Sequence, residues 1–234
     1  MDLAFSILFY IFDIGGENIM NYILDLDGTL MDTVEDLGNA INSALSELGF
    51  PIYSKEMVKT FVGNGSISFV MKSLGDRQNK FEEVFELFSK FYKDCCTENA
   101  KPYPGVLEFL EKNSGKVAIL TNKPIEQTLK ILGKFNLERH FTCILGGDTA
   151  PERKPDPSGI LKIIEDSKWN LNETMMVGDD VPDIGAARAA GVKVAIILSG
   201  FGKASELLEH KPDYAFKDFE EFAEKSQNNS PCAS

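Results

Sequence analysis

The 234 residues suffice for one large domain or two modest ones, and 43% hydrophobic with 26% charged residues is typical of a soluble globular protein. Acidic residues number 36 against 24 basic ones, which gives a net charge of −12. This excess argues against nucleic-acid partners, which need clustered Lys and Arg, and against docking to anionic membranes.

The first 19 residues do not match the rest of the chain. Residues 3–14 are mainly apolar, but about a dozen residues cannot span a bilayer, which takes roughly 20. Asp2 precedes this run and no basic segment accompanies it, so a signal peptide fits poorly. Our hypothesis is that translation naturally starts at Met20 and that residues 1–19 are an extension, not native, or a loosely packed appendage.

Two aspartates end the apolar run that begins at residue 21. Asp25 and Asp27 are one residue apart, and Gly28 and Thr29 follow at once. A short apolar run before a turn predicts a buried strand, whose pleat would place both carboxylates on one side. Such carboxylates resist ionising together, and a bound cation such as Mg²⁺ is the usual remedy. A calcium loop fits less well, because it wants Gly at its sixth position, where Leu30 stands. A plain turn also remains open.

Residues 33–97 have a helical period. Apolar residues recur every three or four positions, and Gly49 stands where a first helix would end. The stretch Gly63-Asn64-Gly65 interrupts the pattern. We interpret the aromatic stripe of the last helix as the core of a small bundle rather than a ligand pocket. The predicted helices cover residues 34–48, 55–61, 66–74 and 80–95, and residues 97–105 form the return linker.

The remaining chain alternates between strands and helices. The predicted strands are 116–120, 142–145, 174–177 and 192–198, and the predicted helices are 124–135, 157–167, 182–190 and 203–210. Such alternation indicates an α/β fold with a doubly wound parallel sheet covered on both faces. Sheets of this kind bind ligands at the carboxyl ends of their strands.

Polar residues gather at those carboxyl ends. None is decisive alone: Asp180 could simply cap the helix before Pro182, and an isolated Lys154 would usually be a solvated surface charge. Their order along the chain carries the inference. The full set is Asp25, Asp27, Thr121, Asn122, Lys154, Asp179, Asp180 and Asp183.

This ordered set resembles the four motifs of the haloacid dehalogenase-like hydrolases, which are mostly Mg²⁺-dependent phosphatases, over about residues 20–216. The run that starts at Gly178-Asp179-Asp180 looks most like the phosphoglycolate phosphatase-like branch. The resemblance implies a Rossmann-like core (20–32 and 98–234) with a small helical cap domain inserted after the first motif (33–97). Gly63-Asn64-Gly65 is similar to the substrate-facing loop of that cap.

The resemblance also implies roles for single residues. Asp25 would attack phosphorus and form an aspartyl-phosphate, and Asp27 would be the general acid and base. Thr121 and Lys154 would hold the phosphoryl group. The Mg²⁺ ligands would be Asp25, the backbone carbonyl of Asp27 and Asp179. Asp183 would belong to the metal site indirectly, by orienting the waters on Mg²⁺ or the side chain of Lys154. Substrate contacts would come from Gly28, Asn122, Gly63, Asn64 and Gly65.

Alternative functions remain open. A phosphomutase of the same fold, similar to β-phosphoglucomutase, would shield the phospho-aspartate from water. A true dehalogenase would leave Asp27 idle, and an inactive sensor or scaffold would not need the complete set of acidic residues. Phosphoglycolate is the first substrate to consider, but nucleotides, sugar phosphates and pyrophosphate stay open, as do the oligomeric state and the role of Asp180.

The cysteines suggest no metal or redox site. None of Cys95, Cys96, Cys143 and Cys232 has Cys-x-x-Cys spacing, so a reducing cytoplasm fits best.

Overall fold

The computed structural model describes residues 20–227, so the hypothesis about residues 1–19 and the position of Cys232 lie outside the described part of the chain. Its strands are β1 (Asn21–Leu24), β2 (Met31–Asp32), β3 (Lys101–Pro102), β4 (Val117–Leu120), β5 (Phe141–Leu145), β6 (Thr174–Gly178), β7 (Lys193–Ile197) and β8 (Tyr214–Phe216). Its α-helices are α1 (Val34–Glu47), α2 (Lys55–Lys59), α3 (Gly65–Leu74), α4 (Phe81–Cys95), α5 (Val106–Lys112), α6 (Ile125–Lys134), α7 (Ser158–Ser167), α8 (Val181–Ala190), α9 (Ala204–Glu209) and α10 (Phe219–Gln227).

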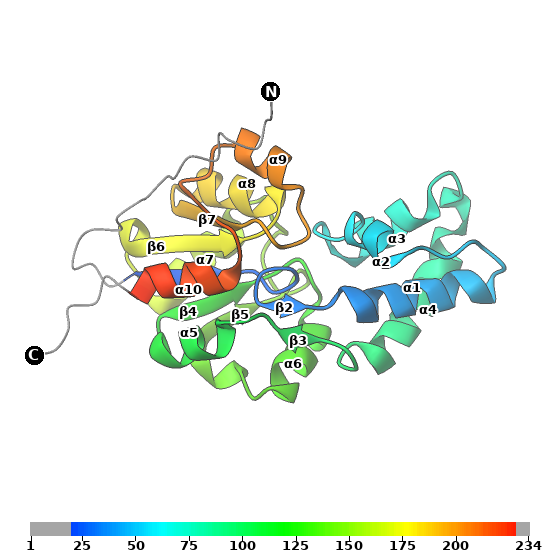
Figure 1. The fold of residues 1–234 in the computed structure, drawn as a ribbon, viewed down its shortest axis with the longest axis horizontal. Coiled ribbons are helices and arrows are strands. Elements are labelled where there is room, and N and C mark those ends of the chain that lie inside the picture. The colour runs from blue at the N-terminus through cyan, green and yellow to red at the C-terminus, as the bar shows by residue number, and fades with distance from the viewer. Residues whose placement is uncertain (1–19, 228–234) are drawn as a thin grey trace, which may run out of the picture.

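A parallel sheet forms the centre of the molecule, with strand order β5-β4-β1-β6-β7-β8 (Figure 1). Both β1 and β4 are buried along their whole length, as expected for strands covered on both faces. The chain moves outward from β1 first through β4 and β5 and then through β6, β7 and β8. The strand order therefore reverses between β1 and β6, which is where a doubly wound sheet binds its ligand.

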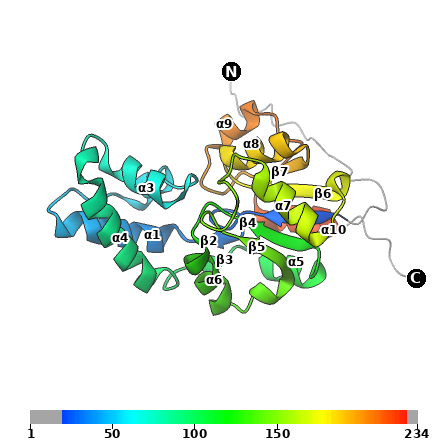
Figure 2. The same ribbon diagram turned by 180° about the vertical axis from the view of Figure 1, so that it is seen from behind.

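Two helical layers cover the sheet. Phe109 of α5, Ile131 of α6 and Phe222 of α10 pack against one face. Ile160 of α7, Ile184 of α8 and Leu207 of α9 pack against the other face, and Figure 2 shows this layer from behind. The predicted α/β fold with a doubly wound parallel sheet is confirmed. Within the described residues, no helix combines the length and the apolar character that crossing a membrane would need.

Helices α1–α4 lie together at one end of the molecule, to the right in Figure 1. They have a hydrophobic core of their own, in which Ile41 and Leu45 of α1 meet Val84 and Phe88 of α4. The predicted helices are present here, although α2 ends earlier than expected, at Lys59. That residues 33–97 act as a separate domain stays a prediction.

A buried carboxylate links, through hydrogen bonds, the two chain segments that connect this helical insert to the sheet. Asp36 of α1 is fully buried and accepts hydrogen bonds from the backbone N–H groups of Asn99 and Ala100, both at 2.9 Å. The side-chain amide of Asn99 donates a further bond at 2.8 Å. Because β2 and β3 also pair antiparallel beside it, the outgoing and returning chains are held together at one place.

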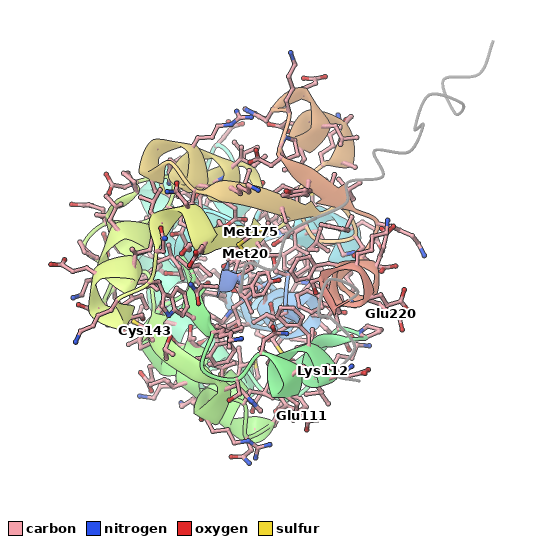
Figure 3. The ribbon with its side chains drawn as sticks, turned by 90° about the vertical axis from the view of Figure 1, so that its left-hand side faces the viewer. Met20, Glu111, Lys112, Cys143, Met175 and Glu220 are labelled. Atoms are coloured by element: carbon pink, nitrogen blue, oxygen red, sulfur yellow. The ribbon has the colours of Figure 1, made fainter. Side chains whose placement is uncertain are left out.

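The amino ends of the parallel strands lie at the end of the sheet that is far from the helical insert (Figure 1). Figure 3 looks onto this end, where Met20 lies next to Met175. The strands begin here and run away from the viewer, so their carboxyl ends all face the helical insert.

Candidate active site

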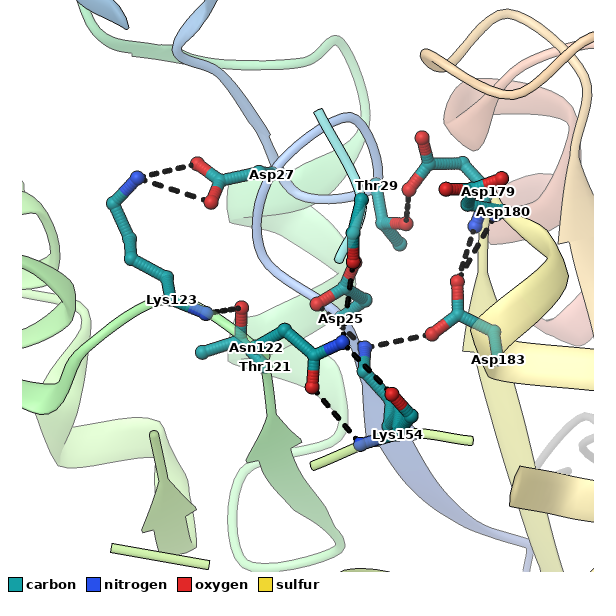
Figure 4. Close-up of polar contacts among 11 residues, drawn as sticks. Asp25, Asp27, Thr29, Thr121, Asn122, Lys123, Lys154, Asp179, Asp180 and Asp183 are labelled. Carbon is teal, nitrogen blue, oxygen red and sulfur yellow. Dashed lines mark hydrogen bonds and ion pairs between the residues drawn. The ribbon is translucent and has the colours of Figure 1, made fainter. Parts of the chain in front are cut away.

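The sheet brings Asp25 and Asp179 together at the point where its strand order reverses. Leu24 pairs with Val177, and the backbone N–H of Asp25 donates to the carbonyl of Val177 at 2.9 Å. Asp25 therefore leaves β1 beside the end of β6. Carboxylate oxygens of Asp25, Asp179 and Asp183 lie within 4.8 Å of one another. Figure 4 shows these three side chains in close-up.

A buried lysine lies in this acidic cluster. The ammonium of Lys154 is 2.8 Å from Oδ1 of Asp25 and 2.7 Å from Oδ1 of Asp183. Burial alone would lower the pKa of Lys154, but the two carboxylates more than offset this and raise its pKa above the ordinary value. Lys154 is therefore a fixed positive charge at the cluster, rather than the surface charge that its type alone suggests.

The carboxylates repel each other across this buried space. Burial raises the pKa of Asp25 to about 6, helped by the charge of Asp183 and opposed by Lys154. Burial also raises the pKa of Asp179 well above its usual value, and the charge of Asp25 adds to the effect. The cluster is therefore short of positive charge.

Asp179 is held rigidly by groups from two separate loops. The hydroxyl of Thr29 donates to its Oδ1 at 2.7 Å, and the backbone N–H of Phe201 donates to its Oδ2 at 2.7 Å. Gly28 lies directly against this carboxylate: its φ is +86°, and a Cβ there would come within 2.2 Å of Oδ2 of Asp179. Glycine is thus required at position 28 by both conformation and space.

Asp180 and Asp183 form the beginning of α8. Oδ2 of Asp183 accepts hydrogen bonds from the backbone N–H groups of Asp179 (3.1 Å) and Asp180 (3.0 Å). The side chain of Asp180 accepts from the N–H of Val181 at 2.8 Å, and the two residues form a capping box. Asp180 therefore caps α8, which is one of the roles that the sequence left open for it. Both oxygens of Asp183 are already engaged, one by Lys154 and one by backbone.

The residues present fit a divalent cation. Oδ1 of Asp25 is buried, and within the described chain no group makes a hydrogen bond of good geometry to it, although Lys154 approaches it as an ion pair. Asp25 and Asp179 offer hard oxygen atoms on two sides of one space, which suits Mg²⁺ or Ca²⁺ better than a soft metal. Asp183 is better placed to orient Lys154 and the loop than to bind a metal directly.

Asp27 points away from this cluster. Its two carboxylate oxygens accept hydrogen bonds from the ammonium of Lys123 at 2.9 and 3.0 Å, and the hydroxyl of Thr33 donates to it at 2.5 Å. The hydroxyl of Thr121 accepts from the backbone N–H of Lys123 at 3.2 Å, which fixes the start of this loop. The predicted pair of carboxylates is therefore split between two neighbouring surroundings, one with Lys154 and one with Lys123.

A cavity of about 250 Å³ opens next to Asp25 and Asp27. Thr121, Asn122 and Lys123 line it from the sheet side. The helical insert supplies a mostly apolar wall, which consists of Leu37, Val62, Gly63, Gly65, Ser66, Phe69, Phe85, Phe88, Ser89 and Tyr92. Part of the aromatic stripe thus also faces this cavity, whereas the sequence predicted only a packing role for it.

The loop at residues 63–65 touches the sheet at the site. Asn122 donates from its amide to the carbonyl of Gly63 at 3.1 Å and to that of Lys154 at 3.0 Å, and it accepts from the N–H of Lys154 at 2.9 Å. A Cβ at Gly63 would come within 1.9 Å of Oδ2 of Asp180. Asn64 is exposed and lines a separate hollow beside Asp180. Substrate contacts by this loop and by Asn122 stay predictions.

Sequence reasoning assigned no role to Lys123, Thr29 or Tyr92. Lys123 directly follows Thr121 and Asn122, and that adjacency was the available signal. Thr29 likewise lies within the first motif. The Lys123 ammonium lies 4.8 Å from the centre of the Tyr92 ring. The sequence around Tyr92 shows only the helical period of α4, because this approach to Lys123 depends on how the insert packs against the sheet.

The raised pKa of Asp25 makes stability depend on pH. Its folded pKa of about 6 lies above the ordinary value of 3.8, so the stabilising contribution of the bound proton is complete below about pH 4 and is lost as the pH rises through 6. Without metal, we expect Asp25→Asn to exceed the wild type in free energy of unfolding by up to about 3 kcal/mol at pH 7.5, since each pKa unit corresponds to about 1.4 kcal/mol. Urea unfolding in EDTA from pH 7.5 to 5 measures this.

The difference between the two proteins should shrink as the pH falls. A difference that stays constant from pH 7.5 to 5 would mean that Asp25 does not titrate in this window. The matched control is Asp166→Asn, an exposed aspartate paired with Lys162.

A family model, curated relatives and solved structures all match this chain to the same family. A family model described as haloacid dehalogenase-like hydrolase matches residues 22–197. The phosphoglycolate phosphatase of Aquifex aeolicus is 36% identical over 195 residues, covering 82% of this chain and 89% of the relative. That of Vibrio parahaemolyticus is 32% identical over 219 residues, covering 89% and 96%. The crystal structure of a predicted phosphoglycolate phosphatase from Haemophilus somnus superimposes with a TM-score of 0.84 at 29% identity, covering 91% of this chain and all of the other.

Proposed function

The chain belongs to the haloacid dehalogenase-like hydrolases and is a phosphatase, and we propose that it hydrolyses a small phosphorylated metabolite through an aspartyl-phosphate on Asp25, with Mg²⁺ as cofactor. Phosphoglycolate is the first substrate proposed, because relatives over 30% identical carry that name. The observation that carries the proposal is the pair Asp25 and Asp27: one is buried against Lys154, the other is bound by Lys123, and both line the same cavity.

In the first step, an oxygen of Asp25 forms a bond to phosphorus while the bond from phosphorus to the substrate's ester oxygen breaks. Asp25 is ionised above about pH 6, as a nucleophile requires. Lys154 holds the attacking carboxylate and offsets negative charge on the phosphoryl group. Asp183 keeps Lys154 in place through its bond at 2.7 Å.

Asp27 supplies the proton for the departing oxygen. It then takes a proton from the water that attacks phosphorus, which releases inorganic phosphate and regenerates Asp25. Lys123 and Thr33 orient the carboxylate of Asp27 for both transfers. The hydroxyl of Thr121 and the backbone near Gly28 are the proposed contacts of the phosphoryl oxygens.

Asp25, the backbone carbonyl of Asp27 and Asp179 are the proposed ligands of Mg²⁺, with Asp183 outside them. When bound, Mg²⁺ supplies positive charge that balances the growing negative charge of the transferred group. The three buried carboxylates support this assignment, as does Oδ1 of Asp25, which has only the ion pair with Lys154 as a partner within the described residues.

The cavity favours a small substrate. Its volume of about 250 Å³ is below the range of roughly 300–1,000 Å³ that is typical for drug-sized ligands. The mostly apolar wall also offers few partners for the many hydroxyl groups of a hexose phosphate, which makes the mutase the weaker alternative. Residues 33–97 are proposed to act as the cap that closes this cavity.

Phosphate release from phosphoglycolate and from p-nitrophenyl phosphate tests the proposal. We expect both substrates to be hydrolysed with Mg²⁺, and chelation by EDTA to lower the rate at least about 100-fold, because metal charge stabilisation is worth several kcal/mol. Asp179→Asn should weaken the response to Mg²⁺. Turnover that EDTA does not change, or isomerisation of a hexose phosphate without phosphate release, would contradict the proposal.

A further inference from the structure

One polar group in the cavity has no use in the chemistry above. Tyr92 of α4 lines the cavity and is only 5% exposed, yet its hydroxyl makes no hydrogen bond within the described residues. A buried hydroxyl without a partner is unfavourable, so most such groups bind something. The missing partner of Tyr92 is therefore expected to be a group that enters the cavity.

Packing holds Tyr92 close to the residues that carry out the reaction. The ring of Tyr92 stacks on that of Phe88 with 5.4 Å between ring centres, and the ammonium of Lys123 lies 4.8 Å from the centre of the Tyr92 ring. The same ammonium binds both carboxylate oxygens of Asp27. Tyr92 is thus one residue removed from the group that protonates the leaving oxygen, and its ring has little freedom to turn away.

The hydroxyl of Tyr92 is a donor at any physiological pH. Burial raises its pKa well above the usual value, and the charge of Asp27 raises it further. A protonated phenol beside an ammonium attracts an acceptor, above all an anionic one. Leu37, Phe69 and Phe85 of the same wall offer no polar atom, and its other side-chain hydroxyls are those of Ser66 and Ser89.

The nearest helix end favours the same kind of ligand. α3 begins at Gly65, which lines the cavity, and the side chain of its N-cap residue, Asn64, makes no hydrogen bond to the first N–H groups of the helix. Its first turn also lacks an acidic residue. Free N–H groups at a helix N-terminus attract negative charge, which adds to the attraction by Tyr92 and Lys123.

We propose that Tyr92 contacts the substrate and sets its class: its hydroxyl donates a hydrogen bond to a carboxylate that lies a few bonds from the ester oxygen. The substrate would then be a short phosphorylated hydroxy acid. This inference rests on the proposed phosphatase function, and it selects phosphoglycolate-like esters over neutral ones of the same size.

The variant Tyr92→Phe tests this with two matched substrates. Phosphoglycolate and ethyl phosphate have the same two-carbon leaving group, except that only the first carries a carboxylate. The variant keeps the ring on Phe88 and under Lys123 and removes only the hydroxyl. We expect its kcat/KM for phosphoglycolate to fall about 10- to 100-fold, as for a lost hydrogen bond to a charged group. For ethyl phosphate we expect less than about a two-fold change.

The control variant is Tyr53→Phe. The hydroxyl of Tyr53 also lies in the insert but donates to the carbonyl of Ser73 at 2.6 Å, outside the cavity lining. It should leave the ratio of kcat/KM for the two substrates unchanged. An equal fall for both substrates in Tyr92→Phe, no fall for either, or a wild type that prefers ethyl phosphate would overturn the inference and leave the phosphatase function intact. No release of phosphate from any ester, p-nitrophenyl phosphate included, would overturn both.

Discussion

Replacing Asp25 with Asn is expected to lower kcat by at least about 10⁴-fold on every substrate, since removal of a covalent nucleophile has effects of this order and larger. The amide is nearly the same size, so packing is preserved while the attacking charge is lost. Lys154 keeps Asp183 as a partner at 2.7 Å, so the loop that carries it should stay in place. Initial rates of phosphate release at saturating substrate measure this effect.

The exposed variant Asp166→Asn is the matched control and should keep wild-type activity, because Asp166 lies on α7 in a surface pair with Lys162. Circular dichroism and a thermal melt establish that Asp25→Asn is folded. A folded variant with more than about one hundredth of wild-type activity would exclude Asp25 as the nucleophile.

The second large effect concerns Asp27, and it should depend on the leaving group. Asp27→Asn removes the acid that protonates the departing oxygen, which typically lowers rates 10²–10⁴-fold. An alkyl ester such as phosphoglycolate needs that proton. The p-nitrophenolate ion leaves without it, so the first step should slow far less for p-nitrophenyl phosphate. The measurement is the burst of nitrophenol under pre-steady-state conditions, compared with alkyl ester turnover.

This comparison separates acid catalysis from positioning. Lys123→Met is the companion variant, because it keeps the carboxylate of Asp27 but removes the ammonium that lies 2.9 Å from its Oδ1. We expect a smaller fall from it than from Asp27→Asn on phosphoglycolate. If Asp27→Asn lowers the rate equally for alkyl esters and for the burst of nitrophenol from the aryl ester, Asp27 has a structural role instead.

Much of the fold could be predicted because its elements have strong local patterns. The buried strands β1, β4 and β6 are continuous apolar runs, and their ends carry the aspartates and the Thr-Asn pair in the predicted order. Because parallel strands end at one edge, that order already places Asp25 near Asp179. The short helix α5 and the terminal pair β8 and α10 were not predicted, since short segments carry too little periodicity to identify.

The finer structure of the site depends on packing between segments distant in sequence. Nothing local to Lys123 indicates that it pairs with Asp27, which lies 96 residues away along the chain. The hydroxyl of Tyr92 gains its importance only from the cavity that two separate parts of the chain enclose. Asp180 is the opposite case: its role as a cap is local, and the order Asp-Val-Pro-Asp was enough to suggest it.

Chemical trapping tests most directly whether the phosphoryl group passes through Asp25. Rapid quenching during turnover, followed by borohydride reduction, converts an aspartyl-phosphate into homoserine, which peptide mass spectrometry locates. We expect homoserine at position 25, more of it in Asp27→Asn with p-nitrophenyl phosphate, and none without substrate. Rapid turnover with no modification at position 25, or with phosphate trapped on another side chain, would contradict the account.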